Sequence, residues 1–328
     1  MNAPTEDFVL NAAQRAEVIA GLNQILPAHA VLHEVEDTKP YECDGLSLFR
    51  QLPMVVALPE TEDQVVQILK LANRLNVPVV ARGAGTGLSG GAQPHKHGIL
   101  LGMAKFNKIL KVDVQSRSAV VQPGVRNLAI SEAVAQHQLY YAPDPSSQIA
   151  CTIGGNVAEN SGGVHCLKYG LTVHNVLKVR AITIEGEIVE FGSEAPDAPG
   201  LELMNLVIGS EGMLAVVTEV TVKLVPKPAL AQVIMASFDD VANAGNAVAA
   251  VIAAGIIPAG LEMMDKRASQ MVEPFVKAGY DTEAEAILLL ESDGTPEEVA
   301  EEIAEMTRVL NGCGATAIKV SQSEAERL

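Results

Sequence analysis

The sequence predicts an α+β fold with two domains, of which the second contains a ferredoxin-like antiparallel sheet. A chain of 328 residues corresponds to roughly two domains. The segment Pro226-Lys227-Pro228 is typical of a linker, and the pattern of strands and helices changes there. Beyond it the order is β-α-β-β-α-β with one extra helix between the middle strands, which indicates a ferredoxin-like sheet. We therefore expect domains at 1–228 and 229–328.

The first part of the chain predicts a parallel βαβ arrangement. Apolar strands flank a helix that begins with a T-x-x-Q capping box at Thr61 and Gln64 and has apolar residues at helical spacing. Asn76 and Pro78 end that helix. The expected elements are a helix (12–26), a strand (29–36), a strand (54–58), the capped helix (61–75) and a strand (77–82).

The remainder of the first domain predicts strands separated by irregular segments. Asn127 can cap a helix that runs to about residue 138. Residues 140–163 have no clean period, and a structureless segment of this length inside a domain is usually functional. The other expected elements are strands at 98–103 and 118–124, a hairpin (176–184 and 187–191) closed at Glu185-Gly186, a helix (201–207) and a strand (214–226).

The second domain predicts alternating strands and helices after the linker. Its strands are rich in β-branched or aliphatic residues, whereas its helices carry apolar residues at helical spacing. The expected elements are strands at 231–238, 258–264, 286–292 and 316–322, and helices at 241–255, 268–278 and 296–312.

Composition and charge exclude several classes of function. The formal net charge of −17 and the 3% aromatic content argue against a nucleic-acid partner, which requires clustered cations or stacking surfaces. The four cysteines, Cys43, Cys151, Cys166 and Cys313, form no CxxC pair, so we expect no disulfide framework, metal site or iron–sulfur cluster. The sequence shows no secretory signal and no apolar stretch long enough to span a bilayer, which predicts no transmembrane segment and a cytoplasmic protein.

The most informative motif is the glycine-rich loop RGAGTGLSGG at Arg82–Gly91. Its G-x-G-x-x-G spacing matches the Rossmann fingerprint, but a strand follows where that fingerprint needs a helix. A P-loop is excluded because no Gly-Lys-Ser/Thr is present. Successive backbone N–H groups can form a nest for an anion, and Arg82, Thr86 and Ser89 add donors. The alternative is a flexible surface turn, which needs fewer glycines.

Three further segments share this chemistry. TIGGN at Thr152–Asn156 and NSGG at Asn160–Gly163 mix glycine with amide and hydroxyl groups, and IGSEG at Ile208–Gly212 places the Glu211 carboxylate in a tight turn. Together they suit the enclosure of a planar, polar ligand through backbone contacts.

These motifs, in the order RGAGTGLSGGA, PDPSS…CTIGGNVAENSGG…KYG and IGSEGMLAVVTEVTVKL, resemble the FAD-binding domain of the vanillyl-alcohol oxidase/p-cresol methylhydroxylase flavoproteins. Within that superfamily the sequence is similar to the family of FAD-linked D subunits of bacterial glycolate oxidase, which groups with D-lactate and D-2-hydroxyglutarate dehydrogenases. The resemblance covers about Tyr41–Leu328. It implies a two-lobed p-cresol methylhydroxylase-type domain, with lobes that divide near residue 110, followed by a partial ferredoxin-like cap domain.

The resemblance implies a cofactor-binding role for each matching position. The residues expected to hold the FAD diphosphate are Arg82, Gly83, Ala84, Gly85, Thr86, Gly87, Ser89 and Gly90. Those expected on the flavin side are Pro143, Asp144 and Ser146, with Cys151, Thr152, Gly155, Asn156, Asn160 and Gly163 near the isoalloxazine and its linker. Those expected near the adenosine are Glu211, Gly212 and Val216. Because the first glycine loop holds no His, we expect non-covalent binding.

The activity implied is the oxidation of a small 2-hydroxy acid, glycolate to glyoxylate, by hydride transfer to flavin N5. The alternatives are a D-lactate or D-2-hydroxyglutarate dehydrogenase, or a non-catalytic FAD-binding subunit. Relatives continue past residue 328 with a histidine-rich cluster and an arginine, so the chain is expected to be C-terminally truncated, and no catalytic residue is assigned. The implied partners are other glycolate oxidase subunits, including an iron–sulfur subunit, with peripheral membrane association through them.

The histidines outside the glycine loop have simpler interpretations. His165 follows NSGG, and we expect a packing or hydrogen-bonding role rather than a direct catalytic one. The His95-x-His97 pair lacks a third ligand nearby in sequence, which favours solvated side chains over a metal site.

Overall fold

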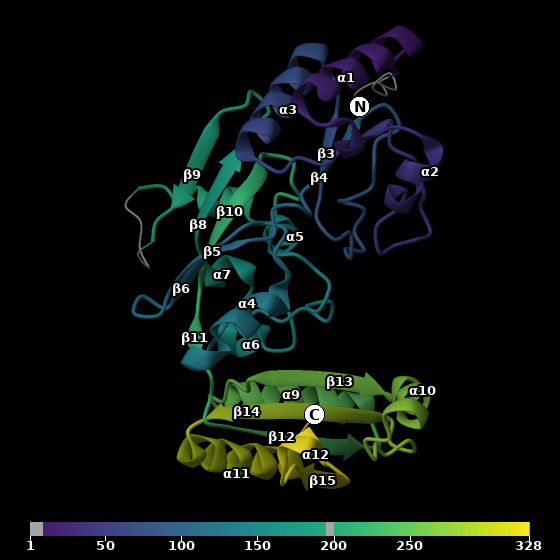
Figure 1. Ribbon diagram of the computed structural model, residues 1–328. Coiled ribbons are helices and arrows are strands. Elements are labelled where there is room, and N and C mark those ends of the chain that lie inside the picture. Colours follow the sequence, from purple (N-terminus) through teal and green to yellow (C-terminus); the bar gives the residue numbers. More distant parts are fainter. Residues whose placement is uncertain (1–8, 195–199, 328) are drawn as a thin grey trace. The chain divides into compact units, whose positions relative to one another are not determined.

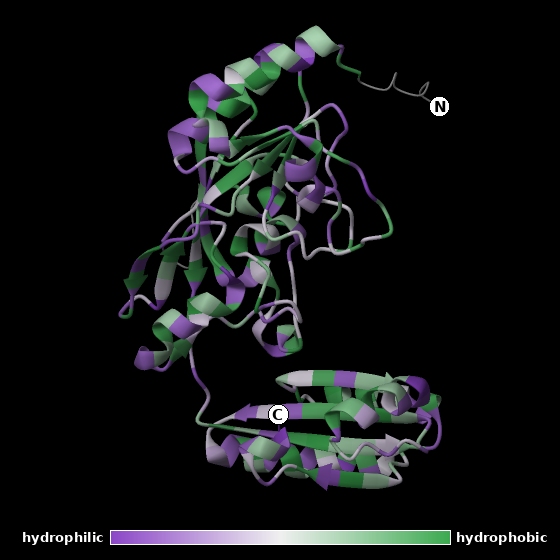
Figure 2. Cartoon of the chain, turned by 45° about the vertical axis from the view of Figure 1, so that its right-hand side comes forward, coloured by the Kyte–Doolittle hydropathy of each residue, from purple (hydrophilic) through white to green (hydrophobic). Residues whose placement is uncertain are grey.

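The computed structural model describes residues 9–194 and 200–327, which form two compact units (Figure 1). The first unit comprises Met1–Tyr141, Ser147–Ser161 and Thr172–Val225, and the second comprises Ala142–Ser146, Gly162–Leu171 and Pro226–Leu328. Each unit is built around its own apolar core. Figure 2 shows hydrophobic residues concentrated along the strands of both units, with hydrophilic residues at loops and on the outer faces of helices.

The first sheet of the first unit contains the predicted parallel strands. Its order is β1-β2-β4-β3, with β2, β4 and β3 parallel and β1 antiparallel to β2. The capping box at Thr61 is confirmed, and the helix behind it buries Val65 and Ile68 against the sheet. The elements are α1 (Ala12–Ile25), β1 (Val31–Leu32), β2 (Val55–Ala57), α3 (Glu62–Leu75), β3 (Val79–Arg82) and β4 (Ile99–Gly102).

The second sheet of the first unit is antiparallel throughout, in the order β5-β6-β10-β8-β9. Apolar residues of these strands pack against apolar residues of the helices α4 and α5. The elements are β5 (Ile109–Asp113), β6 (Ser118–Val121), α4 (Asn127–Val134), β7 (Leu139–Tyr140), α5 (Ile153–Glu159), α7 (Thr172–Asn175), β8 (Val176–Ile182), β9 (Ile188–Gly192), α8 (Met204–Val207), β10 (Val216–Lys223) and β11 (Val225–Pro226), which pairs with β7.

Three local predictions for this unit are wrong. The strand expected at 29–36 is only two residues long and is followed by a short helix, α2 (Val35–Thr38). Asn127 is buried and is the first residue of α4, while Arg126 occupies the N-cap position. Asn127 therefore does not cap this helix. The stretch 140–163 contains the helix α5, whose two glycines masked its helical period in the sequence.

The second unit has the predicted ferredoxin-like topology. Its sheet order is β13-β14-β12-β15, antiparallel throughout, and α9 and α11 pack on the face that carries Ile234, Leu288 and Leu290. The elements are β12 (Leu230–Phe238), α9 (Val241–Ala253), β13 (Gly260–Asp265), α10 (Lys266–Val276), β14 (Ala286–Gly294), α11 (Pro296–Gly312), β15 (Ala317–Val320) and α12 (Glu324–Arg327).

Two short upstream segments belong to this second unit. Ala142–Ser146 and Gly162–Leu171, which includes α6 (Cys166–Tyr169), fold with the residues after Pro226. They flank in sequence the stretch 147–161, which belongs to the first unit. No helix in the described part of the chain is both long and apolar enough to cross a membrane.

Candidate functional site

A pocket in the first unit brings the three glycine-rich motifs together. It lies among the loop after β3, the helix α5 and the turn before β10. The predicted residues that line it are Arg82, Gly83, Ala84, Gly85, Thr86, Gly87, Cys151, Thr152, Gly155, Asn156, Glu211, Gly212 and Val216. The order of these motifs in the sequence therefore corresponds to one site in space.

The remaining predicted residues lie outside this lining. Ser89, Gly90 and Asn160 belong to the first unit, and Asn160 is the left-handed C-cap of α5. Pro143, Asp144, Ser146 and Gly163 belong to the second unit. A side chain at Gly163 would collide with the Asp144 backbone, so close packing explains this glycine without a ligand.

The segment around Asp44 makes hydrogen bonds to the glycine-rich loop. The buried Asp44 carboxylate accepts the backbone N–H of Gly90 at 2.9 Å and that of Leu46 at 2.9 Å. Gly45 donates its N–H to the Gly87 carbonyl at 2.9 Å. The loop is therefore held at Gly90 by the Asp44 carboxylate and at Gly87 by a backbone hydrogen bond, which favours an ordered loop over a flexible turn.

Arg82 supplies a buried positive charge to the pocket. Its guanidinium donates to the Ala92 carbonyl at 3.3 Å and lies over the Tyr41 ring at 5.9 Å. Burial lowers the pKa of Arg82, with nearby Asp44 acting in the opposite direction. Among the described residues no carboxylate lies within ion-pair distance of this guanidinium. A buried cation without a carboxylate partner is suited to an anionic ligand.

The helix α5 presents two buried polar groups that lack partners. The Thr152 hydroxyl and the Asn156 amide nitrogen line the pocket and make no hydrogen bond within the described residues, although Thr152 is 8% and Asn156 is 3% exposed. Leaving such groups unsatisfied costs about 1–3 kcal/mol each. Their position indicates that a ligand with hydrogen-bonding atoms completes the site.

Several pocket residues were missed in the sequence. These are Ala81, Ala92, Met103, Pro123, Ala158, Glu159, Ala215 and Val217, whereas the lining residues Gly91, Ser147, Gly154 and Ser161 lie inside the predicted motifs. The spacing of Thr152, Asn156 and Glu159 places them on one face of a helix. A helical interpretation of TIGGNVAENSGG would have found Glu159, but its glycines concealed the period.

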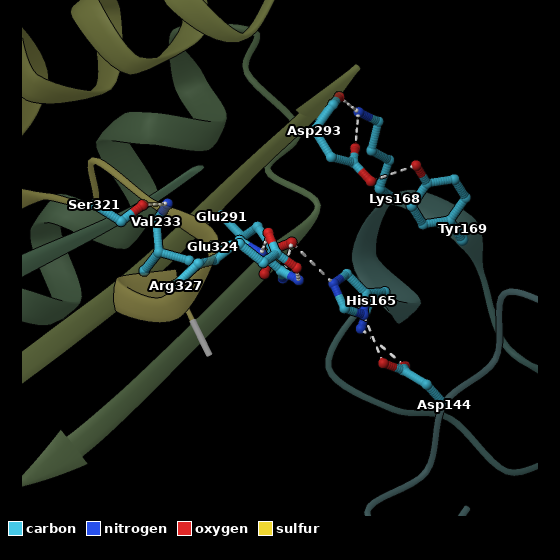
Figure 3. Close-up of polar contacts among 10 residues, drawn as sticks. All are labelled: Asp144, His165, Lys168, Tyr169, Val233, Glu291, Asp293, Ser321, Glu324 and Arg327. Atoms are coloured by element: carbon cyan, nitrogen blue, oxygen red, sulfur yellow. Dashed lines mark hydrogen bonds and ion pairs between the residues drawn. The ribbon is translucent and has the colours of Figure 1, made fainter. Parts of the chain in front are cut away.

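A second cluster of charged residues lies within the second unit (Figure 3). The His165 imidazole lies between two carboxylates, with Nδ1 2.5 Å from Asp144 Oδ2 and Nε2 3.5 Å from Glu291 Oε1. Arg327 of α12 donates to the same Glu291 oxygen at 3.1 Å. The hydrogen bonds to Asp144 and to Glu291 raise the pKa of His165 to about 10. The expected hydrogen-bonding role of His165 is therefore seen in the structure.

A parallel set of contacts joins α6 to the end of β14. Lys168 Nζ lies 2.5 Å from Asp293 Oδ1, and the Tyr169 hydroxyl donates to Asp293 Oδ2 at 2.6 Å. Because Glu291 and Asp293 are two residues apart on one strand, their side chains lie on the same face of the sheet. The two sets of ion pairs therefore fasten the segments 142–146 and 162–171 to β14.

The pairing of His165 predicts a stability that falls as the pH rises. Its folded-state pKa lies above the ordinary value, so protonation stabilises the fold fully below about pH 6.5, and this contribution is lost as the pH approaches 10. We expect a loss of about 3 kcal/mol in the free energy of unfolding across this range. Urea denaturation of the wild type and His165→Gln at both pH values checks this, and equal pH slopes would contradict it.

Two family models match the chain and together account for most of it. The model of an FAD binding domain matches residues 53–192, and the model of the C-terminal domain of FAD linked oxidases matches residues 227–328. The chain contains an FAD binding domain and a C-terminal domain of FAD linked oxidases. FAD is therefore its cofactor, as the sequence predicts.

Curated relatives of this chain include two glycolate oxidase subunits and a D-lactate dehydrogenase. It is 56% identical to glycolate oxidase subunit GlcD of Escherichia coli (strain K12) over 322 residues, or 98% of this chain and 64% of that protein. It is 38% identical to subunit GlcD of Bacillus subtilis (87% and 61%) and 36% identical to a D-lactate dehydrogenase of Archaeoglobus fulgidus (81% and 60%). The chain thus spans less than two thirds of each of these relatives.

Solved structures of other proteins share the fold of this chain. A p-cresol methylhydroxylase matches with a TM-score of 0.82 at 18% identity, over 95% of this chain and 67% of the other. An alkyldihydroxyacetonephosphate synthase matches with a TM-score of 0.80 at 20% identity, over 95% and 62%. The p-cresol methylhydroxylase-type fold predicted from the sequence is confirmed.

The residues of the pocket fit FAD. The dianionic diphosphate matches the fixed glycine loop and the buried Arg82 guanidinium, since backbone N–H groups and arginine are common phosphate donors. The unpartnered Thr152 hydroxyl and Asn156 amide can bond polar atoms of the cofactor. The glycines have no side chain, so a ligand can approach the backbone closely at these positions.

Proposed function

We propose that this protein is an FAD-dependent oxidoreductase that oxidises a small 2-hydroxy acid, glycolate to glyoxylate, and passes the electrons to a separate acceptor. The observation that carries the proposal is the 56% identity to a glycolate oxidase subunit over 98% of the chain. The pocket adds support, because its fixed loop, buried cation and unpartnered polar groups suit FAD.

Within this function the chain's own residues bind and orient the cofactor. When bound, FAD supplies the hydride acceptor for oxidation of the hydroxyl-bearing carbon. We propose that Arg82 and the backbone of the glycine loop hold the diphosphate, while Thr152 and Asn156 orient the cofactor by hydrogen bonds. We also propose non-covalent binding, since the loop between Arg82 and Gly91 contains no His.

The electron acceptor is proposed to be another subunit, one that carries an iron–sulfur cluster. Two of the relatives are named as subunits of glycolate oxidase. The cysteines at 43, 151, 166 and 313 are free, and no group of three potential ligands in the described residues could hold a metal ion. Quinone and oxygen are the alternative acceptors to this proposed subunit.

Oxidation of D-lactate is the second candidate function. The relative from Archaeoglobus fulgidus, at 36% identity, is named a D-lactate dehydrogenase. The two candidates share the cofactor site and differ in the group attached to the hydroxyl-bearing carbon. A comparison of both substrates on the same preparation therefore separates them.

The test is an anaerobic visible spectrum of the purified protein before and after addition of a hydroxy acid. Flavin bands that bleach with glycolate support the proposal, whereas bands that bleach only with D-lactate support the second candidate. Asn156→Ala is expected to weaken FAD binding by about tenfold, because one hydrogen bond is lost. Absence of flavin bands after incubation with FAD would overturn both functions.

A further inference from the structure

The Glu159 carboxylate stands beside the loop that is proposed to hold a dianion. Glu159 is the last residue of α5 and lines the pocket. A Cβ placed on Gly91 would lie 2.9 Å from Glu159 Oε1, and one on Gly87 would lie 4.0 Å away. The carboxylate therefore approaches the glycine-rich loop from the side of α5, where the negative end of the helix dipole disfavours its charge.

Two further carboxylates, Glu211 and Asp44, act on the charge of Glu159. Glu211 approaches from the turn before β10 and lines the same pocket, and Asp44 approaches from the segment beneath the loop. Ser89 of the loop contributes a hydrogen bond. Arg82 is the cation in this pocket, yet it forms no ion pair with any of the three carboxylates within the described residues.

The negative charge of the Glu159 carboxylate would repel an anionic ligand unless this carboxylate takes up a proton. Glu159 is exposed to solvent before a ligand binds, yet partial desolvation and the neighbouring Glu211 already raise its pKa, although the hydrogen bond from Ser89 opposes this rise. A dianionic diphosphate in the loop adds two like charges and removes water, and both effects favour the neutral carboxyl. A protonated carboxyl also becomes a hydrogen-bond donor.

We propose that FAD binding to this pocket is coupled to the uptake of one proton from solvent by Glu159. The neutral carboxyl then donates a hydrogen bond toward the diphosphate, where the carboxylate would repel it. This inference rests on the proposed FAD site. It explains how a pocket lined by carboxylates binds an anionic cofactor. Its thermodynamic consequence is an FAD affinity that falls as the pH rises, because proton and cofactor binding are linked.

The test is FAD binding by the whole chain, measured by titration calorimetry and fluorescence between pH 6 and 9. In the wild type we expect the dissociation constant to rise by up to about tenfold per pH unit. We also expect an uptake of about one proton per FAD, obtained from the heats in buffers of different ionisation enthalpy. Glu159→Gln is neutral at every pH, so its affinity should vary little and should exceed that of the wild type at pH 8.

Two further variants sharpen the result. Glu17→Gln removes an exposed carboxylate of α1 and should keep the wild-type profile. Glu211→Gln removes one neighbouring charge, so the pH at which affinity falls should move to a lower value. FAD binding with the same pH profile and proton uptake in the wild type and Glu159→Gln would overturn the inference alone. Failure of all variants and the wild type to bind FAD would overturn the proposed function and this inference with it.

Discussion

Replacing Gly85 by alanine is expected to weaken FAD binding by about 100-fold. Gly85 has a φ of +71°, and a Cβ at this position would collide with the Arg82 guanidinium. The left-handed conformation costs about 1 kcal/mol for a residue with a side chain, and displacement of a charged donor costs about 1.5–3 kcal/mol. Together these terms amount to about 3 kcal/mol, which corresponds to a factor of about 100 in the dissociation constant.

Fluorescence titration with FAD measures this effect directly. Gly245→Ala serves as the control, because Gly245 lies inside α9 of the second unit with open space around it. Alanine favours a helix there, so this variant should bind FAD as the wild type does. If Gly85→Ala bound FAD as tightly as the wild type, neither the conformation of the loop nor the position of Arg82 would contribute to FAD affinity.

Replacing Asp293 by alanine is expected to destabilise the second unit by about 3 kcal/mol, the usual cost of removing one partner from a buried ion pair. Asp293 is 4% exposed, and its carboxylate is bonded by Lys168 and by Tyr169. The alanine variant removes the carboxylate that both groups bond, while Lys168 Nζ keeps its hydrogen bond to the Asp293 backbone carbonyl at 2.6 Å. Because these contacts fasten the segment 162–171 to β14, that segment should also become more accessible to protease.

Urea denaturation of matched variants tests the size of this contribution. Asp293→Asn keeps an acceptor for the Tyr169 hydroxyl but loses the charge, so its destabilisation should be intermediate. Glu305→Ala removes the partner of Arg308 on the exposed face of α11, where solvent screens the ion pair, so this variant should lose much less stability than Asp293→Ala. Equal stability of Asp293→Ala and Glu305→Ala would contradict the structural role assigned to Asp293.

The pH dependences expected at His165 and Glu159 have opposite physical origins. Paired carboxylates favour the charged imidazolium of His165, so its proton stabilises the folded second unit. Partial desolvation and like charge disfavour the Glu159 carboxylate, so its proton is expected to assist cofactor binding. Unfolding and FAD titration measure the two effects separately, since one belongs to folding and the other to binding.

Local patterns in the sequence determined most of the elements. The capping box at Thr61, the hairpin closed by Gly186 and the linker at Pro226 depend on side chains close in sequence, so each could be predicted without a fold. The strand order of the second unit followed from its β-α-β-β-α-β pattern, because connections of this kind permit few topologies. The glycine-rich motifs indicated an anion site, because glycine lets successive backbone N–H groups point toward one ligand.

Only the tertiary structure decided which distant groups meet. The bond between Lys168 and Asp293 joins residues 125 positions apart, and no period in the sequence links them. The same holds for Asp44 beneath the glycine loop and for Glu159 beside it. Periodicity encodes which face of a helix or strand is buried, whereas pairings between charged groups depend on how complete elements pack. The sequence therefore determined the glycine-rich motifs, and packing decided the charges that surround them.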